Sequence, residues 1–270
     1  MIQLDKTARE QQLWIPRSSK GSGDVRKTYK DGYKDGFDEG LRSSKIKLYD
    51  GMKLGYSEIY NLDDFDFSEV REGNNLFKYS SFYGKDYYDF TDLVKQMTDD
   101  CTEMFTSSHF YGDKEKYPTV RIELYRDIMR GISYFSFYDS IVYLYQNYDV
   151  KSMNNYFTSI YCKELHLYLN TSSCTDFSNL FYNMRNDIYI SGLDMSNEKN
   201  KNETIFNKQS EKINNIYLDD TSVPRTTLER LMDAYRKDTN RYTTIVFHYG
   251  KERWTWDADN NRWTITGYDE

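Results

Sequence analysis

The sequence predicts an α/β repeat fold in which about six short strand-turn or strand-helix units stack on one another. Six dipeptides ending in Phe recur between residues 61 and 220, and their Phe residues are 28, 30, 22, 24 and 25 positions apart. A polar turn and then an alternating apolar–polar run follow each dipeptide, which is the pattern of a half-buried strand. Thin units of this kind bury their apolar faces only when stacked, so we expect a leucine-rich-like solenoid.

The repeat units lie in residues 61–220. Their Phe dipeptides are Leu76-Phe77, Met104-Phe105, Tyr134-Phe135, Tyr156-Phe157, Leu180-Phe181 and Ile205-Phe206. The alternating runs cover residues 86–90, 119–124, 140–145, 164–169, 187–195 and 213–218. Asn residues beside the dipeptides (Asn74, Asn75, Asn154, Asn155 and Asn179) suit tight turns.

Tyrosine is unusually frequent, with 27 residues in a chain whose aromatic content is 17%. Some tyrosines occupy repeat positions at which we would expect Leu, namely Tyr87, Tyr143, Tyr168, Tyr189 and Tyr217. An amphipathic ring packs its body while its hydroxyl stays wet, which suits both thin repeat units and an exposed binding surface.

Residues 1–27 are predicted to be an extended anchoring arm. The apolar Leu13, Trp14 and Ile15 stand between polar flanks, and Pro16 pushes Ile15 toward extended geometry. Residues 18–24 have the composition of a linker. We expect Leu13, Trp14, Ile15, Pro16 and Arg17 to dock on a partner; the alternative is a frayed terminus. The charges from Asp5 onward exclude a secretory signal peptide in this segment.

Residues 28–60 are predicted to be an oligomerisation stem, because residues 29–41 repeat an aromatic residue and a glycine every four positions. On a helix this period places an aromatic stripe beside a glycine stripe. Three glycines cost a helix about 3 kcal/mol relative to Ala, which close contact between copies would offset. The contact residues of the expected homotrimer are Tyr29, Gly32, Tyr33, Gly36, Phe37, Gly40 and Leu41. The alternative is a low-complexity linker.

Residues 221–270 are predicted to be a cap made of a helix and a β-meander. Thr226 and Thr227 precede Leu228, Leu231 and Tyr235 at amphipathic helical spacing. Residues 243–250, 252–256 and 262–266 are expected to form three strands. A solenoid needs its open end closed, which favours a cap. The alternative is a binding tip whose contact residues are Trp254, Trp256 and Trp263.

The chain lacks sequence features of catalysis. Its three His and three Cys residues form neither a CxxC pair nor a tetrahedral ligand set. Residues 257–268 begin like a calcium loop, but Arg262 stands where the loop requires Gly and Tyr268 where it requires Glu. No phosphate-binding loop or nucleophile elbow occurs. We therefore expect no catalytic residue, no cofactor and no metal, and a protein that is not an enzyme.

Charge and hydropathy limit the partners. The chain has 36 basic and 43 acidic residues and a formal net charge of −7, which argues against binding to a phosphate backbone. No run approaches the roughly 18 apolar residues of a membrane helix. We expect neither nucleic acid nor membrane among the partners. A length of 270 residues allows a sizeable core.

Residues 62–77 and 172–197 resemble the repeat of the BspA-like surface-protein family. The resemblance covers roughly 160 residues and implies a leucine-rich-like solenoid that binds rather than catalyses. Family members on bacterial surfaces carry export signals, and the absence of one here favours a protein displayed without secretion. The arm and the glycine-aromatic repeat, about 40 residues, also look like head-fibre or tail-fibre proteins of phages that infect gut Bacteroidales, including the crAss-like group.

These observations predict a bacteriophage virion protein, a capsid-associated head-fibre or tail-fibre component made in the host cytoplasm. Its N-terminus would attach to other virion proteins, and its repeat domain would contact a host-surface glycan or protein. The alternative is a BspA-like adhesin or interaction module of a bacterium. A glycan-active enzyme is the third and weakest reading.

Overall fold

The computed structural model describes residues 45–99, 101, 103–126, 132–133, 136–182, 184, 186–196, 204–206, 213, 215–237 and 245–268. The anchoring residues predicted at 13–17 and the oligomerisation residues predicted at 29–41 lie outside these ranges. Within the described part, the architecture is mostly β, with few helices and open sheets.

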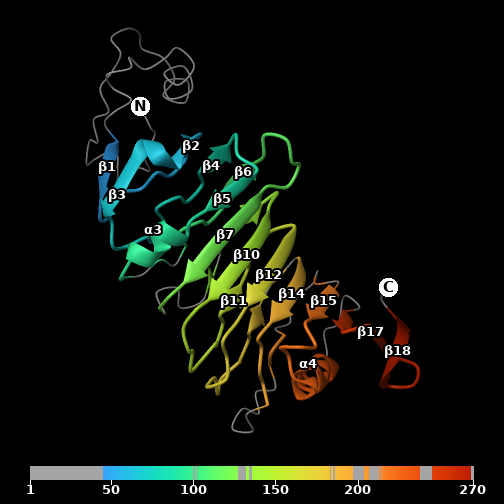
Figure 1. Ribbon diagram of the computed structural model, residues 1–270. Coiled ribbons are helices and arrows are strands. Elements are labelled where there is room, and N and C mark those ends of the chain that lie inside the picture. Colours follow the sequence, from blue (N-terminus) through green and yellow to red (C-terminus); the bar gives the residue numbers. More distant parts are fainter. Residues whose placement is uncertain are drawn as a thin grey trace.

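The largest sheet of the described chain has nine strands (Figure 1). In spatial order they are β5 (Tyr87–Asp89), β7 (Thr119–Leu124), β10 (Ile141–Gln146), β12 (Glu164–Tyr168), β14 (Asp187–Ser191), β15 (Asn215–Leu218), β16 (Val246–Tyr249), β17 (Glu252–Asp257) and β18 (Arg262–Tyr268). The first seven run parallel in chain order, and β17 and β18 continue antiparallel. Each of the six predicted alternating runs contributes one of these parallel strands, which confirms those predictions.

Short strands form three smaller parallel sheets among the described residues. One contains β2 (Glu58–Ile59), β4 (Ser81–Tyr83), β6 (Ser108–Tyr111) and β9 (Phe137–Tyr138). Another contains β8 (Ile132–Ser133), β11 (Phe157–Thr158) and β13 (Phe181–Tyr182), and a third pairs β1 (Ile46–Tyr49) with β3 (Phe65–Glu69). From β5 to β14, the chain therefore returns to a small sheet between successive strands of the large sheet. Strands β1 and β2 fall within the range that the sequence suggests for the stem.

Helices are sparse in the described part: the 3-10 turn η1 (Leu62–Asp64), α3 (Thr91–Gln96) and α4 (Arg225–Lys237). The helix predicted after residue 226 is α4, whose Leu228 and Leu231 are fully buried. Most units turn through bends rather than helices, so the helical share of the predicted α/β repeat is small. No described helix combines the length and apolarity that crossing a membrane requires.

The large sheet buries one of its two faces. Side chains alternate along a strand, and the parallel register aligns Val120, Val142, Leu165 and Ile188 across four strands. These four side chains are at most 1% exposed. A second buried column, two residues further along each strand, contains Ile122, Leu144, Leu167 and Ile190.

Two groups of three neighbouring phenylalanines, together called the inner Phe ladder, complete the core. Their members are Phe77, Phe105, Phe137, Phe157, Phe181 and Phe206, and none is more than 5% exposed. Ring centroids are 5.4 Å apart for Phe77 and Phe105, and 5.1 Å apart for Phe105 and Phe137. Phe181 lies 6.0 Å from Phe157 and 5.7 Å from Phe206. The predicted Phe135 lies outside the described residues, and Phe137 takes part in the stack.

The turns around the inner Phe ladder repeat an uncommon backbone conformation. Positive φ angles occur two residues before and two residues after ladder positions, at Asn75 and Tyr79, Glu103 and Ser107, Asn155 and Ser159, and Asn179. Asn visits this left-handed region more readily than other side chains, because its short polar group bonds locally. The prediction that Asn75, Asn155 and Asn179 make tight turns is confirmed.

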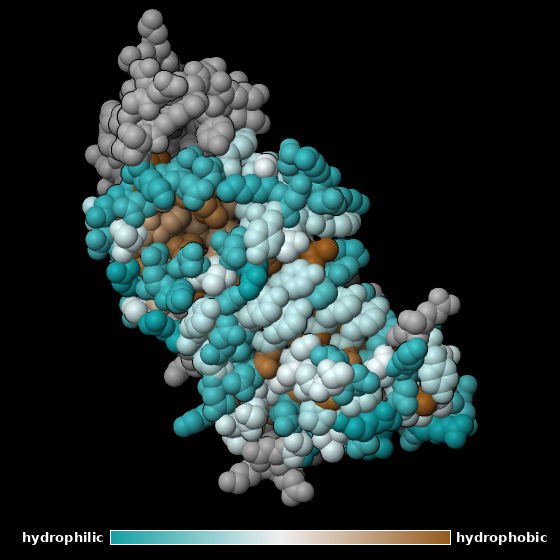
Figure 2. All heavy atoms as spheres, in the orientation of Figure 1, coloured by the Kyte–Doolittle hydropathy of each residue, from teal (hydrophilic) through white to brown (hydrophobic). Residues whose placement is uncertain are grey.

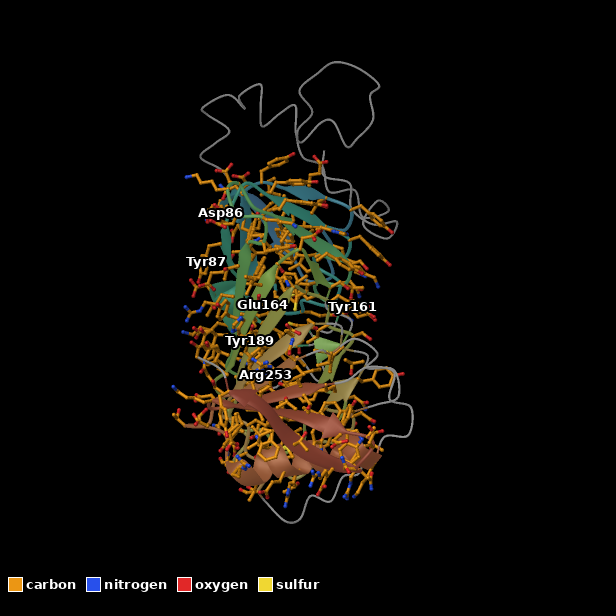
Figure 3. All side chains as sticks on the ribbon, turned by 90° about the vertical axis from the view of Figure 1, so that its right-hand side faces the viewer. Asp86, Tyr87, Tyr161, Glu164, Tyr189 and Arg253 are labelled. Carbon is orange, nitrogen blue, oxygen red and sulfur yellow. The ribbon has the colours of Figure 1, made fainter. Side chains whose placement is uncertain are left out.

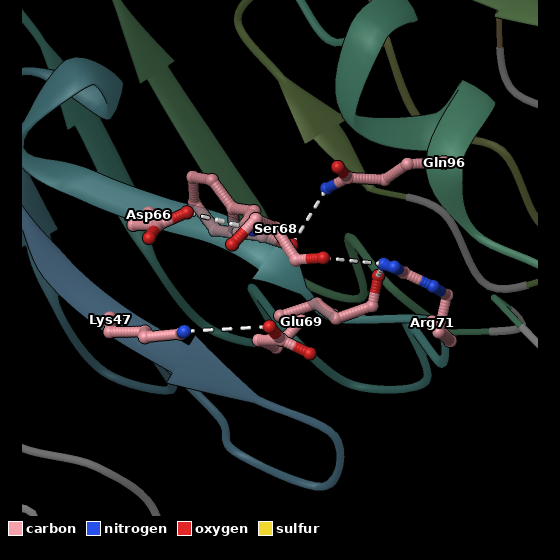
Figure 4. A network of polar contacts seen from close by, with 8 residues as sticks. Lys47, Asp66, Ser68, Glu69, Arg71 and Gln96 are labelled. Carbon is pink, nitrogen blue, oxygen red and sulfur yellow. Dashed lines mark hydrogen bonds and ion pairs between the residues drawn. The ribbon is translucent and has the colours of Figure 1, made fainter.

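An Asp-X-Ser/Thr motif recurs within β3 and where other strands or turns end. In each copy the aspartate Oδ1 accepts the N–H of the Ser or Thr two residues later, at 2.8–3.1 Å; the pairs are Asp66 and Ser68, Asp89 and Thr91, Asp176 and Ser178, Asp194 and Ser196, and Asp219 and Thr221. Figure 4 shows the first copy, in which Gln96 of α3 also donates to the Phe67 carbonyl at 2.9 Å. The backbone at these five Asp-X-Ser/Thr positions therefore shares one hydrogen-bonded geometry.

Candidate binding surface

The outward face of the large sheet carries a column of aromatic rings, here called the outer ladder. It consists of Tyr143, His166, Tyr189, Tyr217 and His248, which the parallel register places side by side on β10, β12, β14, β15 and β16. Successive ring centroids are 4.3, 4.3, 4.3 and 4.1 Å apart, with interplanar angles of 12°, 7°, 4° and 22°. Pale, weakly polar side chains gather over these strands in Figure 2.

Arginines stand at both ends of the outer ladder. Arg121 of β7 pairs in register with Tyr143, and Arg253 of β17 pairs with His248. The Arg121 guanidinium lies 4.9 Å from the Tyr145 ring, which itself stacks on Tyr168 at 4.3 Å. In Figure 3, Tyr189 and Arg253 follow one another along one side of the molecule. The Arg121 guanidinium therefore adds cation–π attraction to Tyr145, two residues beyond Tyr143 on β10.

The geometry of the outer ladder decides which ring atoms meet a partner. Rings that stack at 4.1–4.3 Å turn their faces toward each other. The surface therefore presents ring edges with tyrosine hydroxyls and the imidazole of His166, one residue per strand on β10, β12, β14 and β15, whereas His248 on β16 is only 8% exposed. Neighbouring strands lie about 4.8 Å apart, so these polar groups recur at that interval.

The acidic groups beside the outer ladder have partners on the same face. Glu164 Oε2 lies 3.4 Å from His166 Nε2. Asp187 accepts from the backbone N–H and the side-chain amide of Asn215 at 3.1–3.2 Å. The Asn215 Oδ1 is in turn 3.2 Å from His248 Nε2. The face is therefore polar, and its hydrogen-bonding groups are ordered by one another.

Burial also sets the protonation of the rings. It lowers the pKa of His166 below its ordinary 6.5, although the neighbouring Glu164 acts in the opposite direction. Burial, followed by the charge of Glu164, raises the pKa of Tyr189 to about 12. At neutral pH the ladder accordingly offers a neutral imidazole and a protonated phenol, which donate and accept hydrogen bonds without bringing charge.

A second ladder of tyrosines lies on the four-stranded sheet and consists of Tyr60, Tyr83 and Tyr111. Its ring centroids are 5.2 and 4.8 Å apart. Burial, together with the charge of Glu58, raises the pKa of Tyr60 to about 12, and the Tyr60 hydroxyl donates to Glu58 at 3.1 Å. The second ladder shares the stacking chemistry of the outer ladder but stands on another sheet.

The tryptophans predicted as partner contacts are partly buried and packed against the core. Trp263 lies 5.4 Å from Tyr235 and 5.3 Å from Phe247, and its indole N–H donates to the Met232 carbonyl at 3.1 Å. Trp256 lies 5.4 Å from Trp263. Trp263 therefore joins the hairpin of β17 and β18 to α4, and Trp256 packs on Trp263.

Trp254 belongs to a separate cluster around Arg225. The guanidinium lies 4.9 Å from the Trp254 ring and 5.3 Å from the Tyr249 ring, and its Nη1 is 2.5 Å from Glu252 Oε2. The Trp254 indole also donates to Glu252 at 2.9 Å. The pKa of Glu252 is lowered, first by its bond with Arg225. The three tryptophans therefore do not form one surface, and their contact with a partner stays a prediction.

The residues with potential for catalysis stand apart from one another. In the described ranges, no three His, Cys, Asp or Glu side chains come together in a group that could hold a metal. Cys101, Cys162 and Cys174 are free thiols, and burial raises the pKa of Cys162 and Cys174. Two of the three histidines, His166 and His248, lie in the outer ladder.

Sequence reasoning missed the outer ladder, although it singled out several of its tyrosines. Tyr143, Tyr189 and Tyr217 do not replace Leu in the core as expected, because the inward positions are filled by Val, Ile and Leu. The available signal was the alternation itself: in the runs at 119–124, 164–169 and 187–191, the outward positions between the aliphatic residues carry aromatic, charged or other polar residues. Comparison of the chain with protein-family models, with characterised proteins and with solved structures gives no match.

Proposed function

We propose that the chain is a non-enzymatic virion structural protein of a bacteriophage, and that its repeat region is a leucine-rich-like solenoid displayed for adhesion. One observation carries the proposal: seven parallel strands in chain order hold their side chains in register. Such stacking builds an elongated body with a continuous outward face, and stacked repeats of this kind characteristically bind with extended surfaces.

The use of the polar side chains supports binding rather than catalysis. Acids such as Asp176 and Asp219 bond to turns, and each also reaches a neighbouring unit: Ser152 donates to Asp176 at 3.2 Å, and Ser191 donates to Asp219 at 3.4 Å. His166 is stacked between two tyrosines, and His248 is stacked on one tyrosine. Groups engaged in this way stabilise a surface, and that suits a display protein.

The N-terminal sequence supports attachment to a particle. In the proposal, Leu13, Trp14, Ile15, Pro16 and Arg17 dock on another virion protein, and the glycine-aromatic segment at 29–41 joins three copies. The repeat region then projects toward a host-surface glycan or protein. A bacterial BspA-like adhesin would have the same repeat region but would be attached to a cell.

The test is mass spectrometry and immunogold labelling of purified particles. We expect the full chain on the particle, and we expect a variant lacking residues 1–27 to be absent from it while remaining folded. A matched control deletes residues 18–24 only, which keeps the apolar docking residues. Particles that lack the full chain would overturn the virion role. Particles that incorporate both deletion variants equally would overturn the anchoring role of residues 13–17.

The oligomeric state has its own measurement, because β1 and β2 belong to the sheets and a deletion to residue 60 would damage them. A Gly32→Leu/Gly36→Leu variant fills the glycine stripe and leaves the described strands intact. Light scattering on the full chain is expected to give a trimer and on the variant a monomer. A monomeric full chain would contradict the stem.

A further inference from the structure

We propose that the outer ladder is the site at which this protein binds an uncharged polysaccharide, with the polymer lying across the strands along the column of rings. This inference rests on the proposed display function and names the contact surface and the ligand class. The ladder spans β10, β12, β14, β15 and β16 without interruption. A ligand that meets every strand must itself repeat along its length, as a polysaccharide does.

The chemistry of the surface fits a hydroxyl-rich ligand. Tyr143, Tyr189 and Tyr217 supply phenol hydroxyls and His166 supplies an imidazole, at intervals of about 4.8 Å, whereas His248, at 8% exposed, closes the buried end of the row. Each of these groups can both donate and accept, as sugar hydroxyls do. The neighbouring Tyr168, which is 37% exposed, widens the polar row on the strand of His166.

The charges of the face favour an uncharged polymer. The net charge of −7 opposes a polyanion. A polycation would need free carboxylates, whereas Glu164 lies against His166 and Asp187 accepts two bonds from Asn215. Glu123 is held by Arg121 and by the Tyr125 hydroxyl, which donates at 2.6 Å. Because these acids already have partners, the outer ladder meets a ligand with uncharged hydrogen-bonding groups.

Stacking determines which atoms recognise the sugar. The ring faces along the ladder are covered by neighbouring rings, so a pyranose cannot lie flat on them. Recognition therefore falls to the hydroxyl groups at the ring edges. Replacing Tyr by Phe removes those groups and keeps the rings stacked, so the substitution separates binding from folding.

The experiment compares two triple variants of the full chain in affinity electrophoresis. The test variant is Tyr143→Phe/Tyr189→Phe/Tyr217→Phe, and the matched control is Tyr60→Phe/Tyr83→Phe/Tyr111→Phe in the second ladder. The gels contain dextran, mannan or galactomannan as neutral polymers, alginate as a polyanion, or chitosan as a polycation. Circular dichroism verifies that both variants are folded.

We expect at least one neutral polymer to retard the wild-type chain and the control equally, and the test variant to bind at least roughly tenfold more weakly, a loss of about 1.4 kcal/mol. Equal retardation of both variants would overturn the assignment of the site. Retardation by alginate or chitosan alone, or by no neutral polymer, would overturn the ligand class. Particle composition is measured in a separate experiment. The virion role can therefore fail while the ladder still binds a polysaccharide, and polysaccharide binding can fail while the protein is still found on the particle.

Discussion

The inner Phe ladder and the outer ladder are both built from rings that successive repeat units contribute, yet they face opposite environments. Phe105 is fully buried, with centroids 5.4, 4.7 and 5.1 Å from Phe77, Phe90 and Phe137. Tyr189 has ring neighbours at 4.3 Å on both sides, His166 and Tyr217, and its edge remains partly exposed. One stack closes the core, and the other leaves a row of hydroxyls at the surface.

The difference teaches that regular stacking by itself does not indicate the role of a residue. Inside, the whole ring surface is removed from water, so its contribution is hydrophobic and large. Outside, the gain is limited to ring–ring contact, and the tyrosine hydroxyls lie at the edges of the rings. Stability should therefore depend mainly on the inner ladder and recognition mainly on the outer one.

The largest effect is expected for Phe105→Ala. The substitution leaves a cavity among three other aromatic rings, and large-to-small changes of this kind cost about 3–5 kcal/mol. Denaturant unfolding followed by circular dichroism measures the loss. Phe105→Leu serves as the control and should cost much less; an equal loss for both variants would show that the ring is not packed as described.

A smaller loss is expected for Tyr189→Ala in the outer ladder. Two stacking contacts disappear, each worth about 0.5–1.5 kcal/mol, while no closed cavity forms. The free energy of unfolding should fall by about 1–2 kcal/mol. If this variant is as unstable as Phe105→Ala, the contrast between the two ladders fails.

The turns beside the inner ladder allow a finer test. Glu103 has a φ of 61° at a position where Asn155 and Asn179 serve in other units. Glu103→Asn relieves left-handed strain but loses an ion pair with Lys78, so we expect a net gain of about 0.5 kcal/mol. Asn155→Ala should destabilise by about 1 kcal/mol. Thermal unfolding compares them, and changes of the same sign would contradict the turn repeat.

The smallest expected change concerns pH. Because burial lowers the pKa of His166 in the folded state, the unfolded chain binds that proton more readily. Stability should therefore fall as the pH drops from 7 to 5. The pKa values of Asp89 and Asp176 are lowered from 3.8, so the stability they contribute is lost only in more acidic solution.

His166→Tyr keeps a ring between Tyr143 and Tyr189 and removes the titrating group. The variant should lose less stability than the wild-type chain between pH 7 and 5, as measured by urea unfolding at several pH values. Identical pH dependence in the two proteins would mean that His166 is as easily protonated in the folded state as in the unfolded chain.

Much of the fold follows from local patterns. The run at 119–124 alternates strictly, and β7 occupies the same residues. The amphipathic spacing from Leu228 to Tyr235 predicts a helix, and α4 covers it. Such predictions succeed because alternation and helical spacing depend only on neighbours within a few residues. The candidate site was harder, because Tyr189 and Trp263 look equally available in a sequence.

By itself, the sequence determined where the strands of the large sheet lie, which of their positions are aliphatic, and where Asn can turn the chain. Only the tertiary structure decided that Tyr143, His166 and Tyr189 touch, and that Trp263 is held against α4. The physical reason is that stacking depends on the hydrogen-bonded register between residues 23 positions apart in the chain. That register is set by parallel pairing across whole units, which no local pattern specifies.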